Sequence, residues 1–534
     1  MQLRTSNIRK LDQGIYDVLI VGGGINGAVS AAALSGKGAR VALIDQRDFA
    51  GFTSQQSSNL VWGGIKYLEN YDYALVRKLC LSRNHLLRNY PSRVREIRFF
   101  ASIDKEFRFH PLFLWAGAWL YWLFGNGFTQ TPRLLSRRTI RREEPVVKTQ
   151  NTVGGFEYSD AYLPDNDARF VFQFVRSAMD RGGVAANYVE SLGARREGEF
   201  WIARARDVID GGEMGIRARV LINAAGPFVD GHNVLTGEQT EHRHVFSKGI
   251  HLIVPRMTAN PRILTFFADD GRLFFVIPMG ARACIGTTDT PVATPFAEVT
   301  DEDRRFVLDN INRRLTLDRP LTHTDIIAER YGVRSLVVKA QTGNHGHDWL
   351  RLSRKHEIEV DWVKAHLSIF GGKLTDCINV GDEVSRIVAQ LGITLPHRDH
   401  RWYGEPHVSV REEYLRQARL MNLDSHAVPS SGEPLTSRLW RCYDQQALEL
   451  LAEIREDPRQ AGAPIEGTDY LRCEIQLAKR REMIVKLEDF LRRRSKIALI
   501  MRREDIRNTM GLMEICEILF GDRAREKFDE YFQG

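Results

Sequence analysis

The sequence lacks paired cysteines of the Cys-x-x-Cys type: its 6 cysteines lie far apart in a chain of 534 residues. Cysteines scattered in this way argue against a zinc site and a disulfide framework, and they are typical of a reducing compartment. We therefore expect no metal. Internal repeats and low-complexity tracts are also absent. An apolar content of 43% with 27% charged residues describes a globular protein, long enough for two or three domains.

A hydrophobic run long enough to cross a bilayer is missing as well. The most apolar stretch, LFLWAGAWLYWLFG at 112–125, has 14 residues, whereas a spanning helix needs about twenty. It is either a buried helix or a surface that faces a membrane, because tryptophan and tyrosine favour membrane interfaces. Residues 1–14 lack the apolar core of a secretory signal, and we expect a short leader that runs directly into the first strand.

An excess of negative charge is absent too. The 75 basic side chains outnumber the 68 acidic ones, which gives a net charge of +7. This balance favours an anionic substrate or an anionic lipid as partner. Nucleic acid is not expected, because no recognisable nucleic-acid-binding module accompanies the basic residues.

The strongest motif of the sequence lies at residues 16–45. A short run rich in branched residues, suited to a strand buried on both faces, precedes the turn GGGINGA. Gly22, Gly24 and Gly27 occupy the GxGxxG positions, which permit a tight turn, close approach to a pyrophosphate and close helix packing. A second strand then ends at Asp45, whose carboxylate can accept hydrogen bonds from ribose hydroxyls. The segment therefore predicts a dinucleotide site rather than a glycine-tolerant loop.

Three later segments place small residues where a nucleotide could approach the backbone closely. Residues 51–59 form a polar loop whose serine hydroxyls are suited to phosphate, although an ordinary solvated loop would have the same composition. Residues 221–227 form a strand followed by a sharp small-residue turn. Residues 367–375 form a strand that meets a glycine pair at the start of a helix, whose N-terminus could face a ligand.

Other segments indicate the domain organisation. Residues 71–145 look helical and are expected to form an insertion, and residues 156–169 are expected to open another helix. Residues 244–289 alternate like strands, which suggests an antiparallel sheet in a second domain. Beyond about residue 395 the composition is that of a linker, and from residue 436 onward it is typical of helices.

Taken in order, the motifs of this chain resemble those of the FAD-dependent glycerol-3-phosphate dehydrogenases of the aerobic, membrane-associated type, with the related oxidases. The resemblance runs from about residue 16 to the C-terminus. It rests on GGGINGA, SSNLVWGGIKYLE, GFEYSDAYLPDNDARFV, NAAGPFVD, KGIHLIVP, IGTTDTP, YGVRSL, IFGGKLT and RREMIVKLEDFLRRRS. Single motifs recur in many flavoproteins, but their joint order is specific.

The resemblance implies an α/β Rossmann-type FAD-binding domain, an antiparallel-sheet substrate domain and a C-terminal all-helical domain. On this basis residues 1–400 form the FAD-dependent oxidoreductase region and residues 401–534 the helical domain. Within the former, FAD-binding segments at about 14–75, 150–240 and 345–395 alternate with substrate-domain segments at about 76–149 and 241–344.

The resemblance also implies an activity. Members of this family bind FAD and oxidise sn-glycerol 3-phosphate to dihydroxyacetone phosphate by hydride transfer to flavin N5. Dehydrogenases pass the electrons to quinone and oxidases to oxygen. A peripheral location on the cytoplasmic face of the inner membrane is implied as well, and a homodimer stays open. Two alternatives also stay open: a different small polyol phosphate or hydroxy acid as substrate, and a catalytically idle flavin-binding paralogue.

The resemblance further assigns roles to residues. His251 is implied as the base, Arg334 as the cation that grips phosphate or orients substrate, and Lys373 as a contact to substrate or flavin. Substrate contacts are implied for Lys66, Tyr67, Arg334 and Thr288, with Asp289 in a supporting position. Cofactor contacts are implied for Gly22, Gly24, Gly27, Asp45, Ser57, Ser58, Val189, Ala225, Gly226, Gly371, Gly372, Lys373, Leu374 and Thr375.

The chain departs from the family pattern, which usually reads close to SSKLIHGGLRYLE, at all three of its basic positions. Asn59 replaces its lysine, Trp62 its histidine and Lys66 its arginine. Lys66 keeps the charge but loses the bidentate fork that suits phosphate. Trp62 introduces a large ring near the flavin. The flavin half of the resemblance is therefore better matched than the substrate half.

Overall fold

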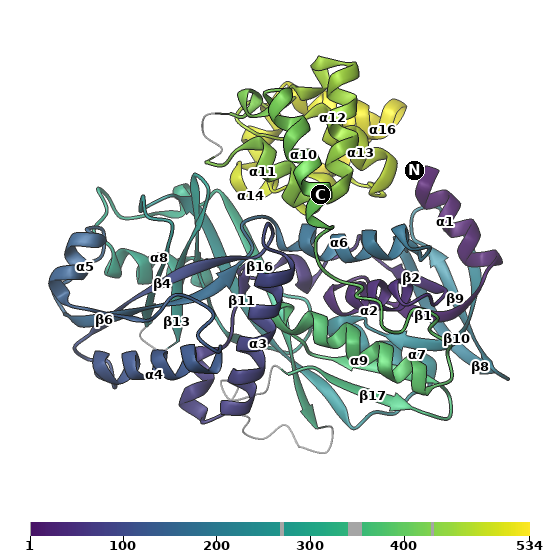
Figure 1. The fold of residues 1–534 in the computed structure, drawn as a ribbon, viewed down its shortest axis with the longest axis horizontal. Coiled ribbons are helices and arrows are strands. Elements are labelled where there is room, and N and C mark those ends of the chain that lie inside the picture. Colours follow the sequence, from purple (N-terminus) through teal and green to yellow (C-terminus); the bar gives the residue numbers. More distant parts are fainter. Residues whose placement is uncertain (1, 268–271, 340–354, 429–431, 534) are drawn as a thin grey trace.

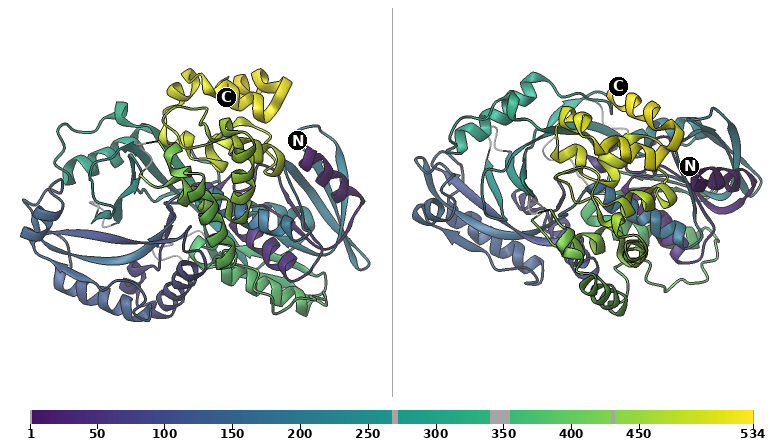
Figure 2. Two further views of the ribbon diagram at one scale, coloured as in Figure 1. Left: turned by 45° about the horizontal axis from the view of Figure 1, so that its top comes forward. Right: turned by 90° about the horizontal axis from the view of Figure 1, so that it is seen from above.

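Two β-sheets lie side by side beneath a cluster of C-terminal helices in the computed structural model (Figure 1). It describes residues 2–267, 272–339, 355–428 and 432–533. Figure 2 shows the same arrangement from two further sides, with the helices from residue 408 onward gathered over one end of the sheets.

The first sheet is built around β1, with parallel neighbours on both sides. Its path runs β17-β18-β10-β1-β2-β7, and β9 and β8 extend it from β10 as an antiparallel pair. The strands are β1 (Ile15–Val21), β2 (Val41–Asp45), β7 (Val184–Asn187), β8 (Val189–Glu197), β9 (Phe200–Asp207), β10 (Glu213–Asn223), β17 (Glu357–Asp361) and β18 (His366–Phe370).

Continuous apolar runs form the central strands of this sheet because both faces are covered: α2, α6 and α9 pack on one face, and α1 (Gln2–Gln13) with β8 and β9 packs on the other. In β2, for example, every residue before Asp45 is buried. The helices are α2 (Ile25–Gly36), α6 (Asp167–Asp180), α7 (Val229–Thr236) and α9 (Cys377–Gln390). The carboxyl ends of β1, β2, β10 and β18 meet at one edge, which is where ligands bind in parallel α/β sheets.

The second sheet is mostly antiparallel and runs β15-β11-β14-β13-β12-β4-β6-β3, with β16 on β11 and β5 on β6. Only β12 and β4 pair in parallel among its described strands. The strands are β3 (Leu60–Val61), β4 (Arg95–Asp104), β5 (Arg133–Leu135), β6 (Thr152–Tyr162), β11 (His242–Pro255), β12 (Ile263–Phe267), β13 (Leu273–Met279), β14 (Arg282–Gly286), β15 (Thr290–Val292) and β16 (Ala328–Lys339).

Two expectations from the sequence were wrong in this region. The segment 71–145 is not wholly helical, because β4 lies between α3 (Tyr73–Asn89) and α4 (Pro111–Phe124) and joins the second sheet, while α5 (Arg137–Glu143) follows. The start of the segment 156–169 is strand β6, and α6 begins only at Asp167. Cross-strand aromatic stacking favours the strands: the ring centroids of Phe99 and Tyr158 are 5.0 Å apart.

The segment before the first strand is helical. Helix α1 (Gln2–Gln13) precedes β1 and packs against β7 and β10. Arg4 fixes it there, since its guanidinium is buried and pairs with the Asp207 carboxylate at 2.6 Å. A buried, paired arginine explains why an apparently polar segment is ordered against the sheet.

The most apolar segment forms α4, and it is not a buried helix. Tyr121 is 1% exposed on its inner side, but Phe113 is 64% and Leu123 58% exposed on the other. Across the described ranges, every helix is too short or too polar to span a bilayer. One face of α4 is therefore packed and the other is apolar and open.

The C-terminal region is all helical, as predicted, and it has two apolar cores of its own. Its helices are α10 (Val408–Leu420), α11 (Leu435–Tyr443), α12 (Ala447–Glu456), α13 (Arg472–Arg481), the π-helical turn η10 (Asp489–Arg494), α14 (Ile497–Ile500), α15 (Arg503–Asn508), α16 (Gly511–Phe520) and α17 (Ala524–Gln533). The predicted fold class is confirmed, whereas the proposed domain boundaries stay a prediction.

Candidate functional site

A cavity of about 1130 Å³ lies at the carboxyl edge of the first sheet, between it and the second sheet. The loop after β2, the turn before α2, the end of β10, the middle of β11 and β16, and the turn after β18 all contribute to its walls. These segments are far apart in the sequence. The cavity is large enough for an extended dinucleotide and a small substrate.

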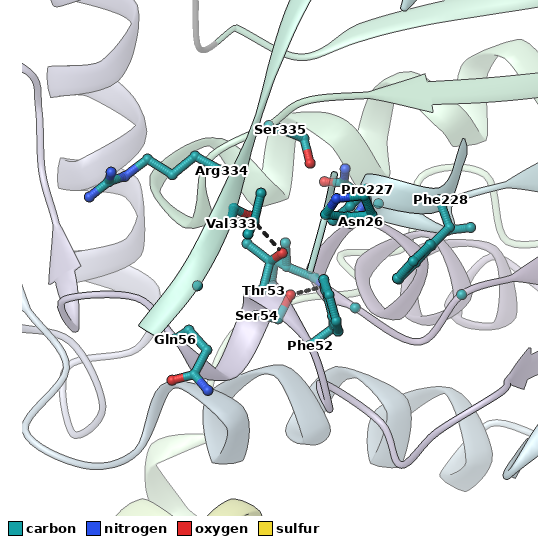
Figure 3. Close-up of a pocket in the computed structure, with 18 of the residues that line it drawn as sticks. Asn26, Phe52, Thr53, Ser54, Gln56, Pro227, Phe228, Val333, Arg334 and Ser335 are labelled. Carbon is teal, nitrogen blue, oxygen red and sulfur yellow. Dashed lines mark hydrogen bonds between the residues drawn. The ribbon is translucent and has the colours of Figure 1, made fainter. Parts of the chain in front are cut away.

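The glycine turn forms one wall of this cavity. Gly22 has φ 106°, and a Cβ there would lie 2.4 Å from the Ala224 carbonyl oxygen. A Cβ on Gly27 would lie 1.8 Å from the Gly22 oxygen, so no side chain fits at either position. Gly24 caps α2 beside the cavity, and Ser54 Oγ accepts a hydrogen bond from Ile25 N at 3.0 Å (Figure 3).

Asp45 ends β2 and lies on the cavity wall. Its Oδ2 accepts a hydrogen bond from Gly23 N at 2.6 Å, and its Oδ1 accepts one from Arg47 N at 2.8 Å. Burial raises the pKa of this carboxyl to about 6, against the lowering effect of the two backbone N–H groups. Asp45 is thus held in a fixed orientation at the cavity wall.

The side chain of Asn26 links the glycine turn to the turn after β18. Asn26 Nδ2 donates to the Gly371 carbonyl at 2.9 Å, while Asn26 Oδ1 is buried and has no partner among the described residues. A Cβ on Gly372 would lie 3.0 Å from that oxygen. Our sequence prediction missed Asn26, although it is the polar residue inside GGGINGA at the start of an apolar helix.

The serine loop is held by a buried ion pair. Ser57 donates from both N and Oγ to Asp167 Oδ2, each at 2.8 Å. Asp167 pairs with Arg330 Nη2 at 2.6 Å, and Arg330 Nη1 donates to Asn59 Oδ1 at 3.0 Å. The family lysine is therefore replaced by an asparagine that supports this pair. Because Asp167 and Arg330 lie 163 residues apart, no local pattern indicates that they meet.

His251 projects from β11 into the cavity and is 4% exposed. Neither of its ring nitrogens has a hydrogen-bond partner in the described part of the chain. Burial lowers its pKa to about 3, and the charges of Arg330 and Arg334 act in the same direction. The imidazole is accordingly neutral, and one ring nitrogen can accept a hydrogen bond from a ligand hydroxyl.

Arg334 lies on β16 opposite β11, and its guanidinium crosses Gly249, where a Cβ would lie 2.3 Å from Nη2. Its Nη1 donates to Asp289 Oδ1 and to the Thr288 carbonyl, each at 3.1 Å, and its Nη2 donates to Thr287 Oγ1 at 2.9 Å. In Figure 3 the Arg334 side chain extends from β16 away from Phe228. Thr287 lines the cavity and was missed by the sequence prediction.

Lys373 follows the glycine pair and meets the segment after β3. Its Nζ donates to Tyr67 Oη at 2.7 Å and lies 4.1 Å from the centre of the Tyr67 ring. Trp62 lines the cavity nearby, and its carbonyl accepts a hydrogen bond from Thr375 Oγ1 at 3.2 Å. The large ring that departs from the family pattern therefore does form part of the wall.

Most of the predicted site residues meet at this one cavity. Those that line it are Gly22, Gly24, Asp45, Ser57, Ser58, Tyr67, Val189, Ala225, Gly226, His251, Arg334, Gly371, Gly372, Lys373, Leu374 and Thr375. Gly27, Lys66 and Thr288 do not. Thr288 is buried behind the wall, where its Oγ1 accepts a hydrogen bond from Ile250 N at 3.0 Å. Lys66 is half-buried on η2 (Ile65–Asn70), outside the lining.

Three phenylalanines form an apolar part of the wall that was also missed. Phe52 and Phe228 meet edge to face with ring centroids 4.9 Å apart, and both contact Phe296. They come from the loop after β2, the turn after β10 and the loop after β15. Their meeting depends on the fold and leaves no pattern in the sequence.

Comparisons with known proteins agree with this geometry. A family model described as FAD dependent oxidoreductase matches residues 17–349. The glycerol-3-phosphate dehydrogenase of Mycobacterium leprae is 29% identical over 499 residues, covering 91% of this chain and 81% of that protein. The aerobic glycerol-3-phosphate dehydrogenase of Staphylococcus epidermidis is 30% identical over 400 residues, covering 73% and 70%.

A solved structure has the same fold along nearly the whole chain. The X-ray structure of the glycerol-3-phosphate dehydrogenase from Bacillus halodurans complexed with FAD superposes with a TM-score of 0.72 at 22% identity. The match covers 99% of this chain and 96% of that one. The similarity therefore includes the C-terminal helices as well as both sheets.

Proposed function

Because this chain belongs to the FAD-dependent oxidoreductase family and uses FAD as its cofactor, we propose that it oxidises sn-glycerol 3-phosphate to dihydroxyacetone phosphate. We further propose that the electrons pass to quinone. The names of its relatives support the substrate. The observation that carries the proposal is the placement of His251, Arg334 and Lys373 around one cavity beside the glycine turn.

The residues of the cavity fit FAD. The close approach at Gly24 and the N-terminus of α2 suit the pyrophosphate, and the carboxylate of Asp45 suits a ribose. The unpartnered Oδ1 of Asn26, which lies beside Gly372 in the cavity wall, suits a polar group of the cofactor. FAD, when bound, supplies the hydride acceptor that alcohol oxidation requires.

The chain's own residues supply the acid–base chemistry and the charge. The neutral His251 ring nitrogen accepts the proton of the substrate hydroxyl, and the negative charge of a bound phosphate would raise the His251 pKa, which burial and the two arginines hold low in the free protein. Arg334 is fixed by Asp289 and Thr287 and presents a planar cation to the phosphate. Lys373 adds a second positive charge next to Tyr67.

A different small polyol phosphate or hydroxy acid is the second candidate substrate. Two observations favour it: Lys66, which stands for the family arginine, lies outside the cavity lining, while Trp62 forms part of the wall. A phosphate grip with fewer cations and a bulkier wall would change substrate preference.

Anaerobic reduction of the bound flavin tests the function. The holoenzyme is titrated with sn-glycerol 3-phosphate, glycerol and a short hydroxy acid, and the flavin absorbance is followed. We expect bleaching by sn-glycerol 3-phosphate alone. Bleaching by another compound would favour the second candidate, and no bleaching by any of them would indicate a catalytically idle flavoprotein. Reoxidation of the reduced enzyme by a soluble quinone, compared with oxygen, tests the acceptor.

We also propose peripheral association with the cytoplasmic face of the inner membrane. The apolar face of α4 supports this, since Leu112 is 52% exposed beside Phe113 and Leu123. The patch continues onto α3, where Tyr73 lies with its ring 5.9 Å from that of Phe124. Exposed aromatic and aliphatic side chains on one helix face are suited to the boundary between lipid headgroups and acyl chains. Such a position would bring the enzyme to a lipid-soluble quinone.

A further inference from the structure

Three consecutive arginines of the C-terminal region are buried and reach the first sheet domain. Arg492, Arg493 and Arg494 form the end of η10 and are 7%, 3% and 3% exposed. None of them lines the cavity. Each of them has a partner more than four hundred residues earlier, in the segment from 48 to 56 that follows β2. Arg493 also pairs with Asp489 of η10, and Arg494 also donates to the Glu482 carbonyl.

The first partner is the carboxylate of Asp48, at the start of that segment. Arg494 donates from Nη1 to Asp48 Oδ2 at 2.8 Å and from Nη2 to Oδ1 at 2.9 Å, which is a bidentate pair. Arg493 Nε donates to Oδ2 at 2.7 Å, and Asn187 Nδ2 donates to Oδ1 at 2.8 Å. Asp48 is 1% exposed, so its position depends on these donors.

The second partner is Gln55, at the other end of the segment. The Gln55 carbonyl accepts hydrogen bonds from Arg492 Nη2 and, at 3.2 Å, from Arg330 Nη2. Arg493 Nη1 donates to Gln55 Oε1 at 3.3 Å. The C-terminal arginines thus hold the segment at both ends, and Arg330 connects it to the second sheet.

The residues between these two ends form a wall of the cavity. The lining includes Ala50, Gly51, Phe52, Thr53, Ser54 and Gln56. Ser54 Oγ accepts from Ile25 N at the start of α2, and Thr53 Oγ1 donates to the Val333 carbonyl at 3.0 Å. Fixing Asp48 and Gln55 therefore fixes the wall that faces the phosphate-binding turn.

We propose that Arg492, Arg493 and Arg494 are positioning residues for FAD, so that the C-terminal helical region completes the cofactor site from outside. The guanidinium group suits this task because its donors are rigid and planar, so one side chain can hold a carbonyl or a carboxylate in a single orientation. The inference rests on FAD as cofactor and is independent of the substrate.

The test is the affinity of the full-length apoprotein for FAD, measured by quenching of flavin fluorescence. Arg492→Met keeps the apolar length of the side chain and removes the hydrogen bonds from Nη2 to the Gln55 carbonyl and, at 3.4 Å, to Gln56 Oε1. We expect the dissociation constant for FAD to rise about tenfold, because a charge-assisted hydrogen bond to a buried carbonyl is lost. Arg492→Lys keeps the charge and should recover part of this affinity.

Arg438 provides a matched control. It is also a buried arginine of the C-terminal region, but it pairs with Glu474 inside that region, at 2.9 Å from Nη1 to Oε2. We expect Arg438→Met to lower the melting temperature of the apoprotein and to leave the affinity for FAD within about twofold of wild type. An unchanged affinity in Arg492→Met, or an equal loss in Arg438→Met, would overturn the proposal.

If Arg492→Met does not fold, Arg492→Lys and Arg438→Lys form the matched pair. We expect a dissociation constant for FAD raised about threefold in the first and unchanged in the second, since lysine cannot reproduce the planar fork. Equal affinities in both would overturn the proposal. Protease sensitivity of the loop around Phe52 in the apoprotein gives a second measurement, and it should rise only in the Arg492 variants.

Discussion

Asp289 Oδ1 accepts a hydrogen bond from Arg334 Nη1 at 3.1 Å, and the same oxygen accepts one from Ser247. The carboxylate therefore fixes the guanidinium across Gly249 before any substrate is present. The Arg334 side chain is still 24% exposed, on the side that lines the cavity. A cation that is oriented in advance loses less entropy when an anion binds.

Replacing Arg334 by alanine should strongly reduce catalytic efficiency. We expect Arg334→Ala to cost about 3 kcal/mol in transition-state binding, about a hundredfold in kcat/KM, because a charged partner of the phosphate is removed. Steady-state kinetics with sn-glycerol 3-phosphate measure this. Arg304→Ala is the control, since Arg304 is equally exposed and ion-paired with Glu329 but lies on α8 (Asp301–Arg314), outside the lining. Equal losses in both variants would contradict the role of Arg334.

Replacing His251 by glutamine tests the base. Glutamine approximates the size and polarity of the imidazole but cannot accept a proton at neutral pH. We expect the rate of anaerobic flavin reduction at saturating substrate to fall at least about a hundredfold, which is the usual contribution of a general base. Binding of FAD should be unaffected. A reduction rate within about threefold of wild type would assign the proton transfer to another group.

His251 also predicts a pH-dependent loss of stability. The unfolded side chain binds a proton near pH 6.5, whereas burial and the two arginines lower the folded pKa to about 3. Folding therefore favours the neutral form of His251. The stability that this preference contributes is complete above pH 6.5 and is lost as the pH falls toward 3. At pH 5 the stability lost through His251 amounts to about 2 kcal/mol. We expect His251→Phe to lose less stability than wild type between pH 7 and 5 in urea unfolding.

The parts of the site that follow from local pattern were predictable. The glycine turn, Asp45 and the glycine pair at 371–372 occur at strand ends, and parallel strands bring such ends to one edge. The strand β4 was not predictable in this way, because its arginine and aromatic residues suited the helical pattern around it. Pairing with β6 decides its conformation, and that pairing is a tertiary contact.

Residues that act over long separations left no pattern. Arg330 meets Asp167 and Asn59 only in the folded chain. The residues that flank Arg330 in the sequence do not indicate these contacts. Thr287 lines the cavity, whereas its neighbour Thr288 is buried behind the wall. A motif match therefore locates such a residue in the sequence to within one position. Which of two neighbouring side chains faces the cavity is decided by the backbone conformation of the folded chain.

Lys66 offers a test of the substrate loop. Since Lys66 lies outside the cavity lining, we expect Lys66→Arg to leave the Michaelis constant for sn-glycerol 3-phosphate within about twofold of wild type. Trp62→His, at the wall itself, should change it more. A large fall of the Michaelis constant in Lys66→Arg would instead indicate that residue 66 binds the substrate phosphate, as the family pattern implies.

The exposed face of α4 predicts binding to lipid vesicles. Phe113→Ser combined with Leu123→Ser removes two exposed apolar side chains, each of which contributes about 1.5–3 kcal/mol when buried in an apolar environment. We expect the double variant to co-sediment at least about tenfold more weakly with vesicles of phosphatidylethanolamine and phosphatidylglycerol, while flavin reduction by substrate in solution stays unchanged.

The control is Leu420→Ser combined with Val408→Ser, two exposed residues of α10, and it should bind as wild type does. Binding that disappears in high salt would indicate electrostatic attachment alone, because inserted apolar side chains resist screening. Equal binding of all three proteins would show that lipid contacts another surface or none, and the apolar face of α4 would then need a protein partner to cover it.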